Sequence, residues 1–219
     1  GIVVIICLVI SLDLAKHVDK TTRAMTNSAP MVSIVIVNWN TVDLLTACLH
    51  SLDSIVPDCT TEIIIIDNAS TDGSPEFVEK NYPTVKLIRN SSNCGFAVAN
   101  NQGISVAEGE YLLLLNSDTE VSPSAISELA KFLSTHPNVG IVGADLRNPD
   151  NTHQYCFDLL PLPALQILRQ NLFGTSERFK KPSEQTASES TASDPFEVGW
   201  VLGAALMIRR SVLDQIGLL

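Results

Sequence analysis

The sequence of 219 residues predicts an α/β fold with a mixed, mostly parallel sheet flanked by helices. Short apolar runs alternate with segments whose apolar residues recur at helical spacing. Unbroken apolar runs are typical of strands that are buried on both faces, as in a parallel sheet. Several runs end abruptly in a polar residue, and ligands of open α/β sheets bind outside the carboxyl ends of the strands. The pattern therefore predicts a binding site along one edge of the sheet.

The first half of this domain alternates regularly between strand and helix. A β-branched run ends at Asn38, and a second, isoleucine-rich run ends at Asp67. Ser74 and Pro75 suit the cap and first turn of a helix. The elements predicted here are strands at 32–37, 63–66 and 85–88 and helices at 44–52 and 74–81.

The second half continues the alternation and then loosens after Asp145. Ser122 with Pro123 repeats the helix-start signal, and Ser211 and Gly217 are expected to cap and end a last helix. The segment from Phe96 is rich in small residues, so we expect that helix to pack close to the sheet. The elements predicted here are helices at 96–106 and after 123, strands at 111–115, 139–142 and 198–209, and the helix after 211.

The two ends and one loop are expected to lie outside this regular pattern. Residues 1–30 are interpreted as an apolar extension and linker, and residues 31–219 as the domain, incomplete at its C-terminus. The apolar run Ile2 to Ile10 is too short to span a bilayer, so it is either the end of an anchor or an upstream extension. Residues 175–195, rich in Ser, Thr, Glu, Lys and Pro, are predicted to form a mobile loop.

Composition excludes several classes of protein. An apolar fraction of 45% supports a globular core, and a net charge of −10 argues against nucleic acid as a partner. The five cysteines form no CxxC pair, which argues against a zinc site or a disulfide framework and for a reducing compartment. The four histidines lack metal-ligand spacing and are expected to have structural or surface roles.

Two polar groups follow the first two predicted strands. Asn38 and Trp39 come after the first, where an exposed indole could stack on a nucleobase or pack under the next helix. Asp67 and Asn68 come after the second, and a carboxylate there can accept hydrogen bonds from a base or a ribose. Asp72, which precedes a glycine, also suits a turn built by Asx hydrogen bonding.

Two further polar groups lie at a helix start and at a strand end. Gly95, after Asn93, permits close backbone approach where free N–H groups favour phosphate, although a plain loop junction is the alternative. Asn116 and Asp118 follow the run of four leucines and are expected on one side of the extended chain. One carboxylate with a nearby amide suits a divalent cation that a phosphate also holds, whereas a turn residue is the alternative.

Taken together, these segments are far more specific than any one of them. The ordered set VSIVIVNWN, EIIIIDNASTDGS, NCGFAVANNQG, LLLLNSDTE and GWVLGAALMIRR resembles the family 2 glycosyltransferases of the GT-A fold. The similarity is greatest to the bacterial rhamnosyltransferase-like branch and covers roughly residues 32–219. The alternatives are weaker: a nucleotidyltransferase would place a Gly-rich basic loop after the first strand, and a dehydrogenase a GxGxxG motif.

The resemblance implies a role for each strand-end group. Asp67 would bind the base or ribose of a nucleotide-sugar donor, and Asn116 its ribose or sugar. Asp118 would hold Mg²⁺ or Mn²⁺ on the diphosphate, where the cation acts as a Lewis acid. The donor side would comprise Asn38, Trp39, Asp67, Asn68, Asp72, Asn93, Gly95, Asn116 and Asp118, and the acceptor or sugar side Trp200, Gly203 and Ala204.

The sequence departs from the family pattern in two places. Asn116 stands where the family often has the first Asp of a DxD motif, so Asp118 alone is expected to anchor the metal. The family's catalytic carboxylate normally follows a segment like 206–219, so the general base is expected beyond Leu219. The whole protein is expected to be an inverting, metal-dependent glycosyltransferase, and residues 1–219 alone are expected to be poorly active.

The function implied is transfer of a sugar, rhamnose from dTDP-rhamnose, to a bacterial surface glycan or lipid-linked acceptor with inversion. Such an acceptor would place the enzyme in the cytoplasm, at the inner membrane face, through peripheral association. The alternative is a nucleotide-sugar-binding domain without turnover. Nothing in the sequence specifies an oligomeric state.

Overall fold

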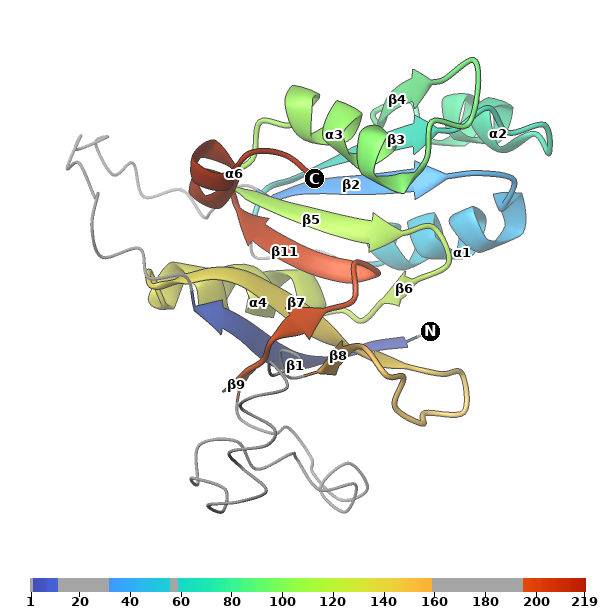
Figure 1. The fold of residues 1–219 in the computed structure, drawn as a ribbon. Helices are drawn as coiled ribbons and strands as arrows, with labels where there is room; N and C mark the ends of the chain where they lie inside the picture. Colours follow the sequence, from blue (N-terminus) through green and yellow to red (C-terminus); the bar gives the residue numbers. More distant parts are fainter. Residues whose placement is uncertain (1, 12–31, 56–58, 159–194) are drawn as a thin grey trace, which may run out of the picture.

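A mixed, mostly parallel sheet forms the centre of the computed structural model, which describes residues 2–11, 32–55, 59–158 and 195–219 (Figure 1). The predicted α/β fold is therefore confirmed. The strands lie in the order β4-β3-β2-β5-β11-β7-β1-β6, and β9 (Phe196–Glu197) pairs with β1. Their bounds are β1 (Ile2–Ser11), β2 (Val32–Asn38), β3 (Thr61–Asp67), β4 (Lys86–Arg89), β5 (Tyr111–Asn116), β6 (Glu120–Val121), β7 (Val139–Arg147) and β11 (Ala205–Arg209).

Helices cover both faces of the sheet because successive strand residues point to opposite sides. Ile36 and Ile65 belong to the larger core cluster, under α1 (Val42–Asp53), α2 (Ser74–Asn81) and α4 (Ala125–Thr135). Val35 and Ile64 belong to the second cluster, under α3 (Phe96–Val106) and α6 (Arg210–Ile216). A separate pair of two-residue strands, β8 (Phe157–Asp158) and β10 (Trp200–Val201), runs antiparallel.

The helix α3 packs against the sheet through Gly103, as its small residues predicted. A Cβ added at Gly103 would overlap Val35 Cγ1 and would lie 2.7 Å from Ile66 Cδ1. No larger side chain fits there without a shift of the helix or of these two core residues. The glycine thus sets the distance between α3 and the strands that carry the site.

The helix-start predictions at Ser122 and Ser211 are wrong. The helix α4 begins at Ala125 after Ser124, and α6 begins at Arg210 directly after β11, without a side-chain cap. Ser74 is the first residue of α2 rather than its cap, and Gly73 precedes it with a φ of 88°. Serine with proline is a local signal, and the tertiary path of the chain decides where the first helical turn closes.

The backbone of β1 lies beside β7 and pairs with it antiparallel from Ile2 to Ser11. Its side chains are outside the described ones, so the domain boundary at residue 31 stays a prediction. The predicted linker at 15–30 and the predicted mobile loop at 175–195 also lie outside the described residues, apart from Pro195. Within the described residues, no helix is long and apolar enough to cross a membrane.

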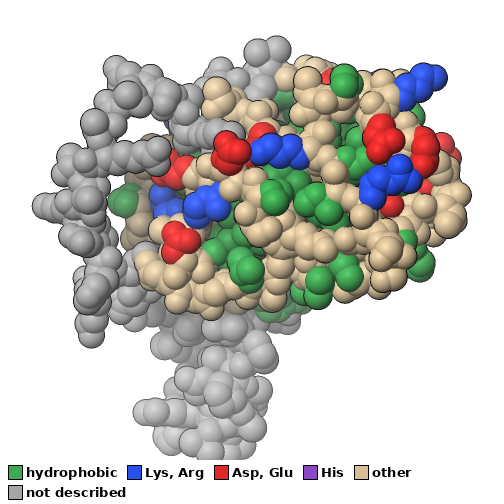
Figure 2. All heavy atoms as spheres, turned by 90° about the horizontal axis from the view of Figure 1, so that it is seen from above, with side chains coloured by type: hydrophobic (Ala, Val, Ile, Leu, Met, Phe, Trp, Pro, Cys, Tyr) green, Lys and Arg blue, Asp and Glu red, His purple; other side chains and the backbone are tan. Residues whose placement is uncertain are grey.

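The face that carries α3 is apolar at its centre and charged at its sides (Figure 2). The charged side chains form ion pairs: Arg89 contacts Glu76 and Glu79, and Lys86 contacts Glu62 and Glu108. The exposed pairs among them contribute little to stability because solvent screens them.

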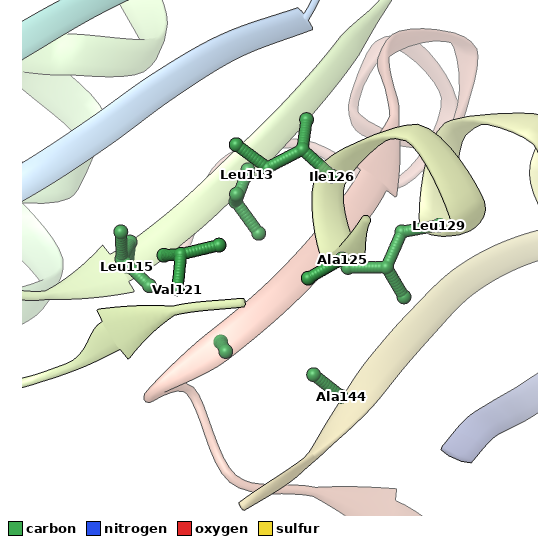
Figure 3. Close-up of a pocket in the computed structure, with 8 residues that line it drawn as sticks. Leu113, Leu115, Val121, Ala125, Ile126, Leu129 and Ala144 are labelled. Carbon is green, nitrogen blue, oxygen red and sulfur yellow. The ribbon is translucent and has the colours of Figure 1, made fainter. Parts of the chain in front are cut away.

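A small apolar void lies between the sheet and α4 (Figure 3). Its volume is about 10 Å³, which is too small for a substrate, and its apolar wall offers a water molecule no partners. The void is a packing feature of the core. Its lining consists of Leu113, Leu115, Val121, Ala125, Ile126, Leu129, Ala144 and Ala205.

Candidate functional site

The carboxyl ends of β2, β3 and β5 meet at one edge of the sheet. The three strands are parallel, Asn38 is the register partner of Asp67, and Val37 is the register partner of Asn116. The polar groups that the sequence places after separate strands are therefore brought together. Because β7 and β5 both run antiparallel to β11, the carboxyl end of β7 lies at the same edge.

Asp67 lies inside a polar network rather than at the surface. Its side chain is 2% exposed, and Asn38 is fully buried beside it. Asn38 Nδ2 donates to Asp67 Oδ1 at 3.0 Å, and the backbone N–H of Ser70 donates to Asp67 Oδ2 at 2.9 Å. A buried carboxylate needs such donors, because an unpaired charge in the interior is costly. Each oxygen keeps a lone pair that a nucleoside hydroxyl or N–H group can use.

Asp72 joins the loops that follow β2 and β3. Its carboxylate accepts hydrogen bonds from the N–H of Val42 at 2.8 Å and from the N–H of Ser74 at 3.0 Å. Slight burial opposes ionisation, but the hydrogen bonds from Ser74 and Val42 outweigh it and hold the pKa of Asp72 below its ordinary value. The geometry makes Asp72 a brace between α1 and α2. Its predicted contact with the donor stays a prediction.

Asn68 and Gly95 belong to a second polar network, on the side of α3. Asn68 Oδ1 accepts from Asn90 Nδ2 at 2.9 Å, and Asn68 Nδ2 donates to the carbonyl of Gly95 at 3.5 Å. The N–H of Gly95 donates to Asn93 Oδ1 at 2.9 Å, so this one N–H is already engaged. Gly95 is required for its φ of 83°, whereas nothing lies within 4 Å of a Cβ built there. The predicted approach of a phosphate to the backbone at Gly95 stays a prediction.

The turn after β5 presents Asp118 to solvent. The strand ends at Asn116, which is half-buried, and the chain turns at Ser117 and Asp118. The expectation that Asn116 and Asp118 share one side of an extended chain is wrong, because the turn breaks the strand's alternation. Within the described residues, the hydrogen bond that the Asp118 carboxylate accepts comes from Thr119 Oγ1 at 3.5 Å. This carboxylate is exposed and only weakly engaged.

A hydroxyl pair ties this turn to the loop after β2. Thr41 Oγ1 and Ser117 Oγ share a hydrogen bond of 3.0 Å, and Thr41 Oγ1 also donates to Asn38 Oδ1 at 2.6 Å. Trp39 is 55% exposed, so it does not pack under α1. An exposed indole and an exposed carboxylate thus stand on loops that are bonded to each other. Thr41 and Ser117 were not singled out by the sequence, because a hydroxyl carries no signal without its partner.

A divalent cation would have one protein carboxylate here. Among the described residues, no group of three or more His, Cys, Asp or Glu side chains could hold a metal ion. Mg²⁺ is commonly held by one or two carboxylates together with substrate phosphates. The exposed, weakly engaged Asp118 fits that mode and does not fit an all-protein cage.

Of the predicted acceptor-side residues, Ala204 is hydrogen-bonded to Asn116. The N–H of Asn116 donates to the carbonyl of Ala204 at 2.9 Å, and a Cβ at Gly203 would lie 3.6 Å from the Phe96 ring. Trp200 lies on β10, edge-on to Tyr155, with ring centroids 5.7 Å apart. The predicted strand 198–209 is in fact β10, a turn and then β11. That turn carries Gly203 and Ala204 to the end of β5.

The structure adds a cluster that the sequence reasoning missed, at the end of β7. Asp145 is 1% exposed, and its carboxylate contacts Arg147 Nε at 3.2 Å and His153 Nδ1 at 3.0 Å. The available signal was weaker than at Asp67, because Asp145 comes three residues after the predicted strand 139–142, and the strand in fact runs to Arg147. The bonding of His153 to it depends on the turn at 148–152, where the N–H of Asn148 donates to the carbonyl of Thr152 at 2.8 Å.

Comparison with known proteins decides the family. The family model described as "Glycosyl transferase family 2" matches residues 33–217. The chain belongs to glycosyl transferase family 2. This confirms the resemblance that the strand-end motifs carry.

Two curated relatives illustrate the similarity. The N-acetylglucosaminyl-diphospho-decaprenol L-rhamnosyltransferase of Mycobacterium tuberculosis is 27% identical over 207 residues, which are 88% of this chain and 65% of that protein. The uncharacterized glycosyltransferase YibD of Escherichia coli is 39% identical over 109 residues, which are 48% of this chain and 31% of that protein. The chain therefore spans less than two thirds of these relatives.

One solved structure shows the fold. The mannosyltransferase PcManGT from Pyrobaculum calidifontis, solved in complex with GDP-Man and Mn²⁺, superposes with a TM-score of 0.55 at 19% identity. The superposition covers 90% of this chain and 51% of that one. The predicted GT-A fold is confirmed.

Proposed function

We propose that this family 2 chain takes part in transferring a sugar from a nucleotide-sugar donor to a glycan or lipid-linked acceptor. The observation that carries the proposal is that exposed Trp39 and exposed Asp118 lie on two loops that a hydrogen bond between Thr41 and Ser117 joins. Asn38 and Asp67, at the ends of the neighbouring strands, are buried and hydrogen-bonded to each other. This arrangement offers an aromatic surface for a base, polar groups for a ribose and a carboxylate for a diphosphate-bound cation.

The donor is proposed to be dTDP-rhamnose, and the transfer is proposed to invert the anomeric carbon. The name of the Mycobacterium tuberculosis relative, a rhamnosyltransferase with a diphosphate-linked lipid acceptor, supports both the sugar and the acceptor class. A lipid-linked acceptor would bring the enzyme to the cytoplasmic face of the membrane by peripheral association. The enzyme would meet its donor in the cytoplasm.

The surroundings of each residue indicate the role that it would have in transfer. Asp67 and Asn38, held in place by Ser70 and Thr41, would orient the nucleoside without reorganising, which lowers the entropic cost of binding. Asp118 would hold Mg²⁺ or Mn²⁺, and the bound cation would stabilise charge on the leaving diphosphate. Asn116, tied to Ala204, would contact the sugar beside the acceptor side.

A transfer assay tests this proposal. Protein expressed from the full-length gene is incubated with Mn²⁺, a synthetic N-acetylglucosaminyl-diphospho-lipid and, in separate reactions, dTDP-rhamnose, UDP-glucose and GDP-mannose. We expect a glycosylated lipid from dTDP-rhamnose, with loss of product in Asp118→Ala and retention in Glu120→Ala, whose carboxylate is also exposed. Donor binding without product from any sugar would favour the non-catalytic binding domain, and no donor binding would contradict the proposal.

A further inference from the structure

The Asp145 cluster lies in the same row of the sheet as Asn116. Leu206 of β11 is the register partner of Leu114 on β5 and of Gly143 on β7. Two residues further along each outer strand are Asn116 and Asp145. Two strand spacings separate them, so their backbones are about 10 Å apart.

Asn116 and Asp145 also point to one side of the sheet. Leu112 and Leu114 lie four and two residues before Asn116 on β5, so the alternation of the strand puts them on the same side as Asn116. Both pack in the cluster under α3 and α6. On β7, a Cβ at Gly143 would meet Val201 of β10 at 3.0 Å, whereas Ala144 packs in the opposite cluster. By this alternation Asp145 is on the side of Asn116 and β10. The cluster therefore borders the proposed sugar side of the site.

The positive charge of Arg147 is enough to balance the negative charge of the buried Asp145 carboxylate. The Nε of Arg147 contacts Asp145 Oδ2 at 3.2 Å, and the Arg147 side chain is 16% exposed. A buried carboxylate needs one such partner, and the arginine is always charged. The contact from His153 to the other oxygen, Oδ1, is therefore not needed to neutralise the pair. What this contact does is fix the orientation of the imidazole.

A histidine held in this way presents a hydrogen-bond acceptor. When Nδ1 carries the proton and donates it to Asp145, Nε2 of the neutral ring has a free lone pair. The His153 side chain is 29% exposed, and no hydrogen bond to Nε2 is recorded within the described part of the chain. A substrate hydroxyl is the group that such a nitrogen binds.

Tyr155 and Trp200 lie on the segment that carries His153 and on the strand β10 beside it. His153 pairs antiparallel with Arg147 of β7, and the N–H of Gln154 donates to the carbonyl of Leu146 at 2.8 Å. Alternate residues of such a paired segment point to one side, so His153 and Tyr155 share a side. Tyr155 is 69% exposed, and its ring meets the edge of Trp200. The N–H of Leu202 donates to the carbonyl of Cys156 at 2.7 Å, which fixes this segment to the loop carrying Gly203 and Ala204. Aromatic faces beside a hydrogen-bonding group suit a sugar ring, which has apolar faces and hydroxyl edges.

We propose that His153, oriented by Asp145, binds a hydroxyl of the acceptor glycan beside the transferred sugar, with Tyr155 and Trp200 against its ring. This inference rests on the proposed function. It assigns acceptor binding to His153, and it assigns to Asp145 the positioning of His153. The acceptor is thereby placed between the end of β5 and the turn at 148–152.

Steady-state kinetics of protein expressed from the full-length gene, with the synthetic N-acetylglucosaminyl-diphospho-lipid as acceptor, test this role. His153→Ala is compared with wild type and with His50→Gln, a control at an exposed histidine on α1. We expect the acceptor KM of His153→Ala to rise about ten-fold, the effect of one lost hydrogen bond, with the donor KM unchanged. Asp145→Asn should also raise the acceptor KM, because the His153 imidazole loses the carboxylate that fixes its orientation.

Donor binding separates the two ways in which the test can fail. The shift of the unfolding midpoint by dTDP with Mn²⁺ should be equal in His153→Ala and wild type. A wild-type protein that transfers sugar, beside a His153→Ala variant with wild-type acceptor KM, would overturn the inference alone. A wild-type protein without donor binding would instead overturn the proposed function. A rise in both KM values would make the cluster a structural support of the whole site.

Discussion

Asn38 and Asp67 form a hydrogen bond across the neighbouring parallel strands β2 and β3, from Nδ2 to Oδ1 at 3.0 Å. Both side chains are buried at the edge where the strands end. Asn38 also donates to Ser70 Oγ and accepts from Thr41 Oγ1. The Asn38 side chain therefore links the loop after β2 to the loop after β3. The two loops of the proposed nucleoside site are thus held together by hydrogen bonds within the chain.

Asp67→Ala should reduce both stability and nucleotide affinity. Removal of the carboxylate leaves one N–H of the buried Asn38 amide and the Ser70 N–H without an acceptor, whereas the other Asn38 N–H keeps Ser70 Oγ. We therefore expect a loss of about 1–3 kcal/mol in the free energy of unfolding. Because the proposed contact is with the nucleoside, dTDP and dTDP-rhamnose should weaken equally. Urea unfolding and calorimetric titration measure the two effects, with Asp53→Ala as an exposed control. Loss confined to the sugar nucleotide would move Asp67 to the sugar pocket.

Gly103→Ala should destabilise the domain although alanine is the better helix former. The added methyl group overlaps Val35 and Ile66, and overpacking of this kind costs about 1–3 kcal/mol, more than the gain of about 1 kcal/mol in helix propensity. Urea unfolding measures the difference against Val98→Ala, at an exposed position of the same helix. A stabilised Gly103→Ala variant would show that α3 does not pack at this distance.

Cys48 should resist alkylation in the folded protein. Burial, together with the charges of Asp118 and Glu120, raises the pKa of its thiol to about 12, so almost no thiolate exists at pH 8. Iodoacetamide labelling followed by peptide mass spectrometry measures the rate, with Cys94, which is half-buried, as the internal comparison and urea-unfolded protein as the control. Equal labelling of Cys48 and Cys94 would contradict the described burial.

Glu62 should make stability depend on pH below about 4.5. Burial disfavours its charge, but hydrogen bonds from Lys86, Ser33 and the N–H of Glu108 outweigh burial and lower its pKa from the ordinary 4.5. A lowered pKa in the folded state means stability that is present above the unfolded pKa and is lost as pH falls through the folded pKa.

The Glu62→Gln variant isolates this effect. It should lose about 1–3 kcal/mol at pH 7, as expected for hydrogen bonds to a charged group, and should lose less than wild type on acidification. Urea unfolding at pH 7, 5 and 3.5 measures the slopes. Parallel pH profiles for the two proteins would exclude Glu62 as a source of acid sensitivity.

The elements with a strong apolar period were predictable from the sequence, and α3 has the predicted bounds Phe96–Val106. The two-residue strands β6, β8 and β10 were missed, because two residues carry no period. The insertion of β11 between β5 and β7 was missed for another reason. Pairing between strands distant in sequence depends on the whole sheet, and no local pattern records it.

The site could be predicted only in part. Strand-end polar residues located the edge, because parallel strands bring their carboxyl ends together. The burial of Asp67 and the exposure of Asp118 were not predictable, since both follow apolar runs and differ only in the turn that comes next. The cluster at Asp145 was missed because its partners follow a turn whose closure needs tertiary contacts.

Thermal unfolding tests whether Asp118 holds a cation on the diphosphate of a nucleotide donor. Wild type, Asp118→Ala and Glu120→Ala are heated with dTDP, UDP or GDP, each with Mn²⁺ and then with excess EDTA. A ligand at about 100 times its Kd stabilises by about 2.7 kcal/mol, which raises Tm by several degrees. We predict a rise with dTDP that disappears in EDTA and in Asp118→Ala but remains in Glu120→Ala. An equal, metal-dependent rise in Asp118→Ala would contradict the account.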